Sequence, residues 1–361
     1  MRYRCNWLLR HLSPCIFAVT MAGLAGTATH AAETMTIAHL YPESLENNDV
    51  APALLHFKQL VEKGTGGEVE VEIFGSGALG SEVETGKQAQ NGRTVQSVLL
   101  SSGAMSSFYK RYQIVATPFL FDSYAHAWGV LDSPWFADFM RGTVETSGLR
   151  YLGTLDDGGG FVAITNNKRL IKTIDDFAGL NIRVEENPAH IATMRALGAS
   201  ATPLPWGEVP TALATGLADG QFNAPVVSVG FKLWEVNDYT TWTGHVYNTL
   251  SWMVSEAWLR DLPEEHQRVI VASAREAVAI AHGIAAHLSV IGWSMSCEKF
   301  DECHVLDDAE RARMRDVTRP AFKEWITGDF DIPAAEVDAF WAEADRIGAS
   351  LKGGKADSYL K

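Results

Sequence analysis

The feature that most constrains the fold is a regular alternation of strand-like and helix-like segments. Residues 69–74 alternate apolar side chains with glutamate, which is typical of a strand with one solvent-exposed face. Uninterrupted apolar runs predict buried strands, and stretches that end in glycine predict helices. Strands are expected at 35–40, 69–74, 95–100, around Tyr151, 161–165 and 181–184, and helices at 50–64, 81–91, near Asp175, at 188–197 and from the sequence Leu262-Pro263-Glu264-Glu265 onward. This order predicts an α/β fold with largely parallel sheets.

The length of the chain, 361 residues, is enough for two cores. Its 47% hydrophobic and 20% charged residues are typical of a globular protein. Ligands of open α/β sheets bind beyond the carboxyl ends of the strands. The sequence therefore predicts two lobes with a ligand site in the cleft between them.

The N-terminus has the features of a secretory signal peptide at residues 1–31. Three arginines (Arg2, Arg4 and Arg10) precede a short apolar stretch from Cys15 to Ala28, and small residues surround the expected cleavage site at Ala31. The apolar stretch is too short to span a bilayer, and no later stretch reaches about 18 uncharged apolar residues. The mature protein is expected to be periplasmic, with no direct membrane insertion.

Two cysteines, Cys297 and Cys303, follow the signal peptide. In an oxidising compartment two cysteines six residues apart can form a disulfide. The neighbouring His304 also allows a metal site, but no fourth ligand is evident, so no metal is expected. The sequence leaves the disulfide open.

The charge balance excludes several partners. The chain holds 44 acidic against 30 basic residues, a net charge of −14 that becomes −17 without the three N-terminal arginines. Such a surface repels phosphate backbones and anionic lipids, so nucleic acid is not an expected partner.

One motif suggests a dinucleotide cofactor. Residues 75–80 match G-x-G-x-x-G after a strand and before a helix. The acidic residue expected at the end of the next strand is absent, and the preceding strand alternates with glutamate where a central parallel strand would be apolar. A glycine-rich turn is the better interpretation, and no cofactor is expected. No nucleophile elbow, zinc-protease motif or P-loop is present, which argues against an enzyme.

Arg183 lies among apolar neighbours in the expected strand 181–184. It fits two interpretations: an ion pair with Glu185 on the same strand face, or a bidentate clamp for a substrate carboxylate.

A longer pattern surrounds this arginine. The stretch 197–233, "LGASATPLPWGEVPTALATGLADGQFNAPVVSVGFKL", resembles the solute-binding proteins of tripartite ATP-independent periplasmic (TRAP) transporters, the dicarboxylate-binding-protein (DctP) family. Four flanking segments, "FGSGALGSEVE", "ATPFLFDSYAHAW", "NNKRLIKTIDDFAGLNIRV" and "DLPEEHQRVI", are similar to family blocks in the same order. The similarity runs from about Met35 to beyond Ile270.

The resemblance implies a two-lobe periplasmic-binding-protein-like fold, with crossing strands and a long helix that spans both lobes. Lobe I is expected at residues 32–157 plus 247–290, and lobe II at 158–246 plus 291–361 with the C-terminal helices. It also implies that the lobes close over a small organic acid and that the closed form docks on the membrane permease subunits.

The resemblance assigns the site by residue. Arg183 matches the arginine that holds the substrate carboxylate, Asn223 the asparagine opposite it, and Trp206 the aromatic residue that packs on the ligand. Trp206 could instead serve ordinary packing between the lobes. Tyr41 and Glu186 complete the expected substrate-binding set.

Departures from the family pattern narrow the range of possible substrates. The strand 161–165 lacks the second arginine of many members, which argues against C4-dicarboxylates, and Leu40-Tyr41 stands where ectoine binders have glutamate. A monocarboxylate such as a sugar acid or a hydroxy or keto acid remains. Four acids could bind hydroxyls or an amine, or simply be solvated: Asp156, Asp157, Glu185 and Glu186. The alternatives are a periplasmic hydrolase or lyase on the same scaffold, and a ligand-sensing partner of a membrane receptor.

Overall fold

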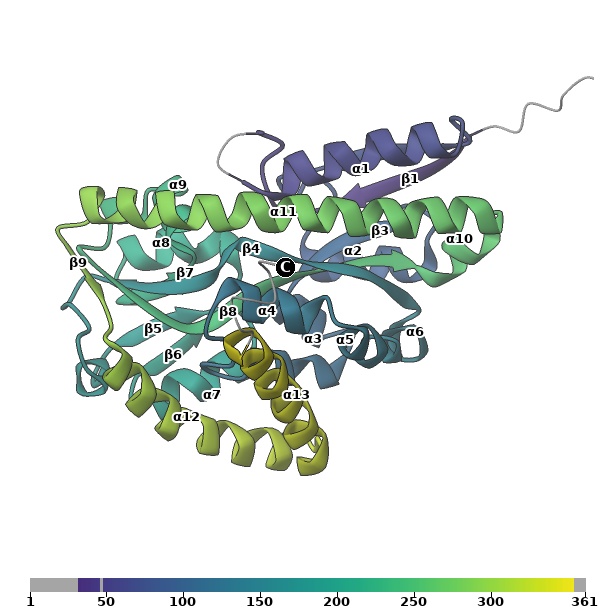
Figure 1. Cartoon of the computed structure of the whole chain (residues 1–361). Helices are drawn as coiled ribbons and strands as arrows, with labels where there is room; N and C mark the ends of the chain where they lie inside the picture. The colour runs from purple at the N-terminus through teal and green to yellow at the C-terminus, as the bar shows by residue number, and fades with distance from the viewer. Residues whose placement is uncertain (1–31, 46–47, 354–361) are drawn as a thin grey trace, which may run out of the picture. The chain divides into compact units, whose positions relative to one another are not determined.

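The computed structural model describes residues 32–45 and 48–353, so the predicted signal peptide lies outside the described residues. Nine strands within these residues form one mixed sheet, in the order β2-β1-β3-β8-β4-β7-β5-β6 with β9 beside β8 (Figure 1). Their bounds are β1 Glu33–Ala38, β2 Val69–Phe74, β3 Ser97–Ser101, β4 Leu149–Asn166, β5 Asn181–Val184, β6 Ser200–Pro203, β7 Gly220–Asn223, β8 Tyr239–Ser255 and β9 Glu302–Val305.

The sheet is less parallel than the sequence predicts. β1 pairs in parallel with β2 and β3, and β5 pairs in parallel with β6 and β7. The central pairs β3–β8, β8–β4 and β4–β7 are antiparallel. The prediction was correct for the two outer groups and wrong for the centre, because two long strands connect the groups there.

These long strands are β4, of 18 residues, and β8, of 17 residues. They pair with each other from Leu149 opposite Ser255 to Asn166 opposite Tyr239. The sequence predicts two separate strands around Tyr151 and at 161–165, but both segments belong to β4. The register breaks inside β4, where residues 157–160 lie between the pairs Asp156–Thr249 and Phe161–Tyr247. This β-bulge carries three consecutive glycines, and we call it the β4 bulge.

Helices cover the sheet. Their bounds are α1 Val50–Gly64, α2 Glu82–Asn91, α3 Ser102–Ser106, α4 Tyr124–Leu131, α5 Pro134–Phe139, α6 Gly142–Ser147, α7 Pro188–Ala196, α8 Val209–Ala214, α9 Pro225–Gly230, α10 Glu256–Asp261, α11 Glu264–Lys299, α12 Asp308–Gly328 and α13 Ala334–Gly353. Short 3₁₀ turns are η1 Lys110–Ala116, η2 Ile174–Phe177, η3 Trp206–Glu208 and η4 Leu233–Glu235. The helix expected near Asp175 is only the turn η2, closed by a capping box of Thr173 and Asp176.

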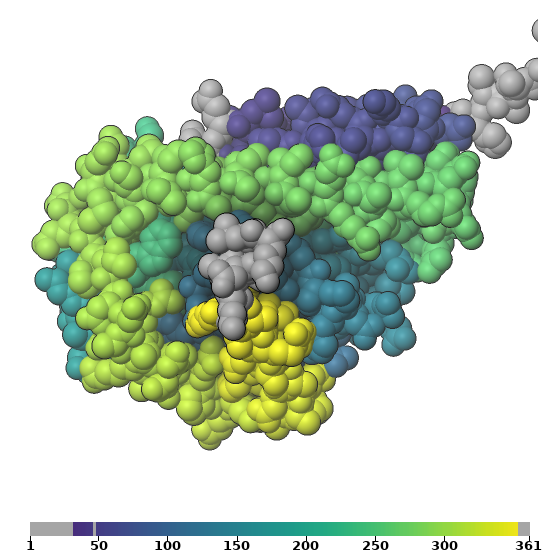
Figure 2. All heavy atoms as spheres, in the orientation of Figure 1, coloured from purple at the N-terminus to yellow at the C-terminus, as the bar shows by residue number. Residues whose placement is uncertain are grey.

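Helix α11 is 36 residues long and contacts β4, α1 and α9. Figure 2 shows α1 and α11 as adjacent bands on one face. By length and composition α11 could cross a membrane. In this fold, however, its residues Ala274, Ala277 and Ala281 are buried in a core with α1 and the strands β1, β2 and β8. It begins after Pro263 with two glutamates at its positive end, as the sequence predicts.

Two further large cores, and a small one that includes Val209 and Leu233, are formed by the described residues. One holds side chains of α4, α5 and α13, including Phe136 and Phe340. The other surrounds β5 and β7 and includes Phe177, Met194 and Phe222. The boundaries of the two lobes stay a prediction.

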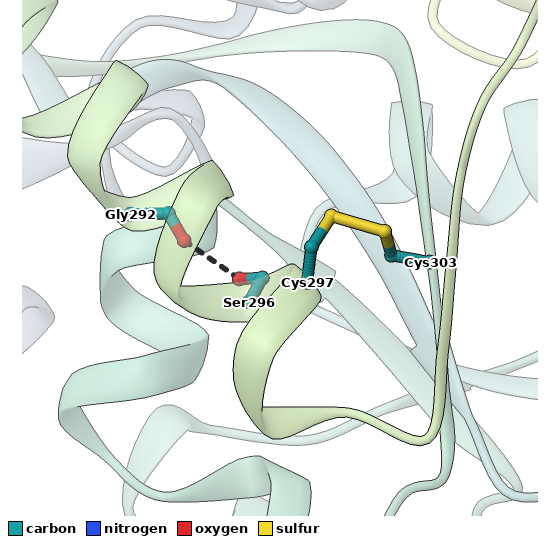
Figure 3. The surroundings of a disulfide bond; sticks show 4 residues. All are labelled: Gly292, Ser296, Cys297 and Cys303. Carbon is teal, nitrogen blue, oxygen red and sulfur yellow. Dashed lines mark hydrogen bonds between the residues drawn. A yellow bond between two sulfur atoms is a disulfide. The ribbon is translucent and has the colours of Figure 1, made fainter.

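A disulfide joins Cys297, near the end of α11, to Cys303 on β9 (Figure 3). The two Cα atoms are 5.2 Å apart. The disulfide interpretation is therefore the one that the structure supports. Because β9 pairs with β8, the bond fixes the turn that carries the chain from the long helix back to the sheet.

We expect the Cys297→Ser/Cys303→Ser variant to lose about 2 kcal/mol of unfolding free energy, since the closed loop is short. Urea unfolding of oxidised wild type, reduced wild type and the variant measures this loss. Reduced wild type should match the variant. Two free thiols in the oxidised protein, counted by thiol labelling, would contradict the assignment.

Candidate functional site

The β4 bulge is the point where the carboxyl ends of both strand groups meet. Three successive antiparallel pairs separate β3 from β7, so the group β1–β3 and the group β5–β7 run in opposite directions. β4 passes from one group to the other through residues 157–160. The segments that follow β1, β3, β5 and β7 therefore converge on the bulge, as expected for a ligand site of an α/β protein.

Glycine is required in the β4 bulge by backbone conformation and by space. Gly158, Gly159 and Gly160 have φ values of 62°, 118° and 70°. A Cβ atom on Gly158 would lie 2.3 Å from Cγ2 of Val227, and one on Gly160 would lie 2.4 Å from the ring of Tyr247. The bulge is thus closely packed against the start of α9 and against β8.

Tyr41, a predicted site residue, contacts the bulge directly. Its hydroxyl donates a hydrogen bond to a carboxylate oxygen of Asp157. The glycine-rich segment 75–80 forms turns, and the Ser76 N–H donates to the carbonyl oxygen of Tyr41 at 2.8 Å. A Cβ atom at Gly75 would lie 2.6 Å from that same oxygen. The glycines therefore let the turn approach and hold the backbone of Tyr41.

Arg183 is buried on β5 with 2% of its surface exposed. Its Nε and one terminal nitrogen donate to the carbonyl oxygen of Leu204 at 3.0 and 2.6 Å. Among the described residues no carboxylate lies within 4.0 Å of this guanidinium, so the ion pair with Glu185 considered above is not formed. A guanidinium has five N–H donors. Within the described residues, three of those of Arg183 have no partner.

Trp206 and Arg183 are brought together. The Arg183 guanidinium lies 5.8 Å from the centre of the Trp206 ring, within cation–π range. The Trp206 ring also meets the Phe231 ring edge-on, with ring centres 4.8 Å apart. Trp206 is half-buried, so it combines packing with a partly free ring face.

Asn223 and Glu186 occupy different positions. Asn223 ends β7, the strand next to β5, is 7% exposed, and donates from its amide to Gln221 at 2.7 Å. Its neighbour Ala224 lies against Gly158 of the β4 bulge. Glu186 is exposed after β5, and it reaches Arg183 only through longer-range electrostatics.

Acidic side chains form the rest of this region. The Ser102 hydroxyl donates to Glu185 at 3.3 Å, across the space between α3 and the end of β5. The adjacent Ser101 donates to Glu82 through its N–H at 2.6 Å and through its hydroxyl at 2.9 Å. Neighbouring serines thus hold the carboxyl groups of Glu82 and Glu185, and we call Glu82, Asp157 and Glu185 the acidic cluster.

Two acids of the acidic cluster hold their protons more tightly than usual. Burial raises the pKa of Asp157 to about 7, and the nearby Glu185 carboxylate raises it further, whereas Tyr41 and Arg183 lower it. Burial also raises the pKa of Glu82 to about 8, against the lowering effect of the Ser101 hydrogen bonds. Burial lowers the pKa of Arg183, and Glu185, Glu186 and Asp157 raise it. Arg183 therefore faces a cluster in which the pKa values of Asp157 and Glu82 are raised.

A family comparison identifies the chain. Residues 43–328 match the family model described as bacterial extracellular solute-binding protein, family 7. The chain belongs to this family. The resemblance to TRAP solute-binding proteins and the prediction of a binding protein over an enzyme are confirmed.

Curated relatives of this solute-binding protein bind different solutes. It is 29% identical to the 2,3-diketo-L-gulonate-binding periplasmic protein of Escherichia coli (strain K12), over 72% of this chain and 78% of that one. It is 28% identical to the ectoine/5-hydroxyectoine-binding periplasmic protein of Ruegeria pomeroyi, over 94% of this chain and 95% of that one.

Solved structures confirm the fold. A TRAP periplasmic solute-binding protein of Ochrobactrum anthropi, with its C-terminus bound in the ligand-binding pocket, matches with a TM-score of 0.79 and 30% identity, covering 91% of this chain and 98% of that one. A second TRAP periplasmic solute-binding protein, from Polaromonas and bound to D-erythronate, matches with a TM-score of 0.77 and 29% identity. The match covers 86% of this chain and 98% of that one.

The sequence did not single out Glu82 or the β4 bulge. Glu82 lies in the first turn of α2 and looks like an ordinary helix-start acid. The run Asp157-Gly158-Gly159-Gly160 was the available signal, since three glycines inside a strand mark a bulge or a close backbone approach. No group of three or more potential metal ligands occurs in the part of the chain that the structure describes.

The raised pKa of Asp157 predicts that the stability of the ligand-free protein depends on pH. Folded Asp157 keeps its proton to about pH 7, while an unfolded aspartate loses it near pH 4. The folded state binds more protons in this window, so this group makes unfolding easier as the pH rises through it. We expect Asp157→Asn to raise the unfolding free energy near neutral pH by about 1–3 kcal/mol.

Urea unfolding across this pH range measures the effect. Asp261→Asn, at an exposed position on α10, is the matched control and should follow wild type. Equal stability of wild type and Asp157→Asn at every pH would show that Asp157 is not held in a raised-pKa environment.

Proposed function

We propose that this protein is the periplasmic solute-binding component of a TRAP transporter and captures a small organic monocarboxylate, such as a sugar acid or a hydroxy or keto acid. Closure of its two lobes would deliver the solute to the membrane permease subunits. Arg183 carries the proposal. It is buried and fixed by Leu204, and it keeps three donors for an incoming carboxylate.

A single cationic anchor favours one carboxylate. Phe161–Thr165, in β4, carries no second arginine. The acidic cluster would repel a second carboxylate but can accept hydrogen bonds from hydroxyl groups. The D-erythronate bound to the Polaromonas protein is a hydroxylated monocarboxylate, which supports this class of ligand.

The proposed contacts follow from these positions. Arg183 and Asn223 would hold the ligand carboxylate and its neighbouring oxygen, and Trp206 would pack on the ligand body. Tyr41 lies beside Asp157, where the far end of a short ligand would be, and exposed Glu186 would act through its charge on Arg183. A sensor that reports to a membrane receptor would use the same site.

A thermal unfolding panel tests the function. D-erythronate, galactonate, pyruvate, succinate and ectoine are compared on the mature protein. A ligand at 100 times its dissociation constant adds about 2.7 kcal/mol of stability, which raises the midpoint by roughly 2–4 °C per kcal/mol. A shift with hydroxylated or keto monocarboxylates alone supports the proposal. A shift only with ectoine or succinate would overturn the substrate class.

Arg183→Ala should abolish this shift. Truncating one side of a buried charge pair costs about 2–5 kcal/mol, so affinity should fall by roughly 30-fold to several thousand-fold. Isothermal titration with the stabilising acid measures the loss. Arg195→Ala, an exposed arginine on α7, is the matched control. An unchanged dissociation constant in a folded Arg183→Ala protein would exclude the carboxylate anchor.

Asn223→Ala should weaken binding less. One buried partner left unpaired costs about 1–3 kcal/mol, or roughly 5- to 150-fold in affinity. The same titration measures it. Wild-type affinity in this variant would remove Asn223 from the site.

A further inference from the structure

Asp156 is the last β4 residue paired with β8 before the bulge, and its side chain is fully buried. Three groups donate to its carboxylate. The Tyr247 hydroxyl and the Trp128 Nε1–H come from β8 and α4, the latter at 3.2 and 3.1 Å from the two oxygens. The third donor is His282 Nδ1 of α11, at 2.7 Å. Asp156 therefore ties β4 to β8, α4 and α11 at one point.

His282 supplies the balancing charge. A buried carboxylate is costly unless it is paired and hydrogen-bonded. Burial lowers the pKa of His282, but the carboxylates of Asp132 and Asp156 outweigh it and raise the pKa to about 9. The imidazole also stacks on Trp128, with ring centres 4.8 Å apart. At neutral pH the imidazolium is thus held between two carboxylates and an indole.

Three acids surround His282. Asp156 faces it from β4, and Asp132, at the end of α4, lies 3.3 Å from its Nε2. Asp49, which precedes α1, interacts with it at longer range, and burial raises the pKa of Asp49 well above its usual range. Of these three acids, Asp156 is the one that directly precedes the bulge in the chain.

The adjacent carboxylates of Asp156 and Asp157 have different roles. Asp156 is fully used by the protein, so it is not available to a ligand. Asp157, one residue later, reaches Tyr41 and belongs to the acidic cluster. Beyond it, the Gly159 carbonyl oxygen accepts a hydrogen bond from Tyr124 at 2.7 Å. The bulge is therefore held at Asp156, just before it, and at Gly159 within it.

We propose that His282 is a positioning residue for solute binding: by pairing with Asp156 it holds the β4 bulge in the shape that places Asp157 and Tyr41 at the ligand site. The binding part of this inference rests on the proposed function. The effect on the bulge itself does not, because it is a property of the ligand-free protein.

Four single variants and one double variant of the mature chain test the proposal. His282→Gln and Asp156→Asn each remove one charge of the pair, and the double variant replaces it with two neutral amides. His287→Gln, exposed on the same helix, controls for the substitution. Asp132→Asn removes the other partner of His282 and leaves the link to β4 intact.

Two measurements follow the bulge and the ligand separately. Hydrogen exchange of the peptide amides at 157–160 is compared with that of α1 in the ligand-free protein. Affinity is measured with D-erythronate. We expect both single variants to show about 2- to 30-fold faster exchange at the bulge and similarly weaker affinity. The control variants should have the exchange rates and affinity of wild type. The free energy lost in the double variant should be smaller than the sum of the losses in the two single variants.

The pH dependence of D-erythronate affinity in wild type distinguishes a positioning role of His282 from a general effect on stability. It does not depend on a variant that folds poorly. The folded pKa of His282 lies above its usual value, so the contribution of the pair is complete below about pH 6.5 and is lost as the pH rises through about 9. Wild-type affinity for D-erythronate should fall across that range. Asp157 and Glu82 titrate in wild type and variants alike, so the difference from the double variant isolates the pair.

Each outcome decides the inference. If His282→Gln lowers the melting temperature but leaves bulge exchange relative to α1 and D-erythronate affinity unchanged, His282 only stabilises the fold and the proposal is wrong. If bulge exchange rises while no acid of the panel binds wild type, the positioning effect stands and the proposed function fails.

Discussion

The antiparallel ladder between β4 and β8 is the interaction on which the rest of the structure depends. Each half of the sheet has its own parallel group, β1–β3 or β5–β7, and the central ladder connects them. Because each strand of the ladder runs through both halves, the two groups point their carboxyl ends toward one another. That direction brings the segments after β1, β3, β5 and β7 to the same place. The site is therefore a consequence of strand polarity.

The ladder is interrupted at the site, and the interruption is stabilised on both sides. Residues 157–160 leave the ladder with three glycines in the left-handed region, a conformation that costs little for glycine and much for other residues. Asp156 stays in a buried network of donors, while Asp157 belongs to the acidic cluster. Two identical side chains, one residue apart, thus have different surroundings, and burial raises the pKa of Asp157 to about 7.

The electrostatics of the site are unbalanced in the ligand-free protein. Arg183 has no carboxylate partner within ion-pair distance among the described residues, although Glu185 follows it by two positions. Glu185 instead accepts from Ser102 and lies 3.7 Å from His190. Keeping a buried guanidinium and buried acids apart costs stability. The proposed ligand, a hydroxylated monocarboxylate, would satisfy both. The arrangement is therefore better suited to binding than to stability.

The sequence by itself determined the local elements and the family. The alternation in β2 and the glycine ends of α1 and α2 are short-range signals, and each of these elements formed where they predict, apart from Ser81, which caps α2 and is not part of it. The blocks around Arg183 and Asn223 identified a solute-binding protein, because a family pattern is a property of residue order.

Only the tertiary structure decided that the segments around Tyr151 and at 161–165 are one strand, that Glu185 turns from Arg183 to Ser102, and that His282 of α11 pairs with Asp156. Glu82 joined the site for the same reason. The contacts Glu185–Ser102 and Asp156–His282 join residues that are far apart in the chain, and they arise from strand polarity and helix packing, which local periodicity does not encode.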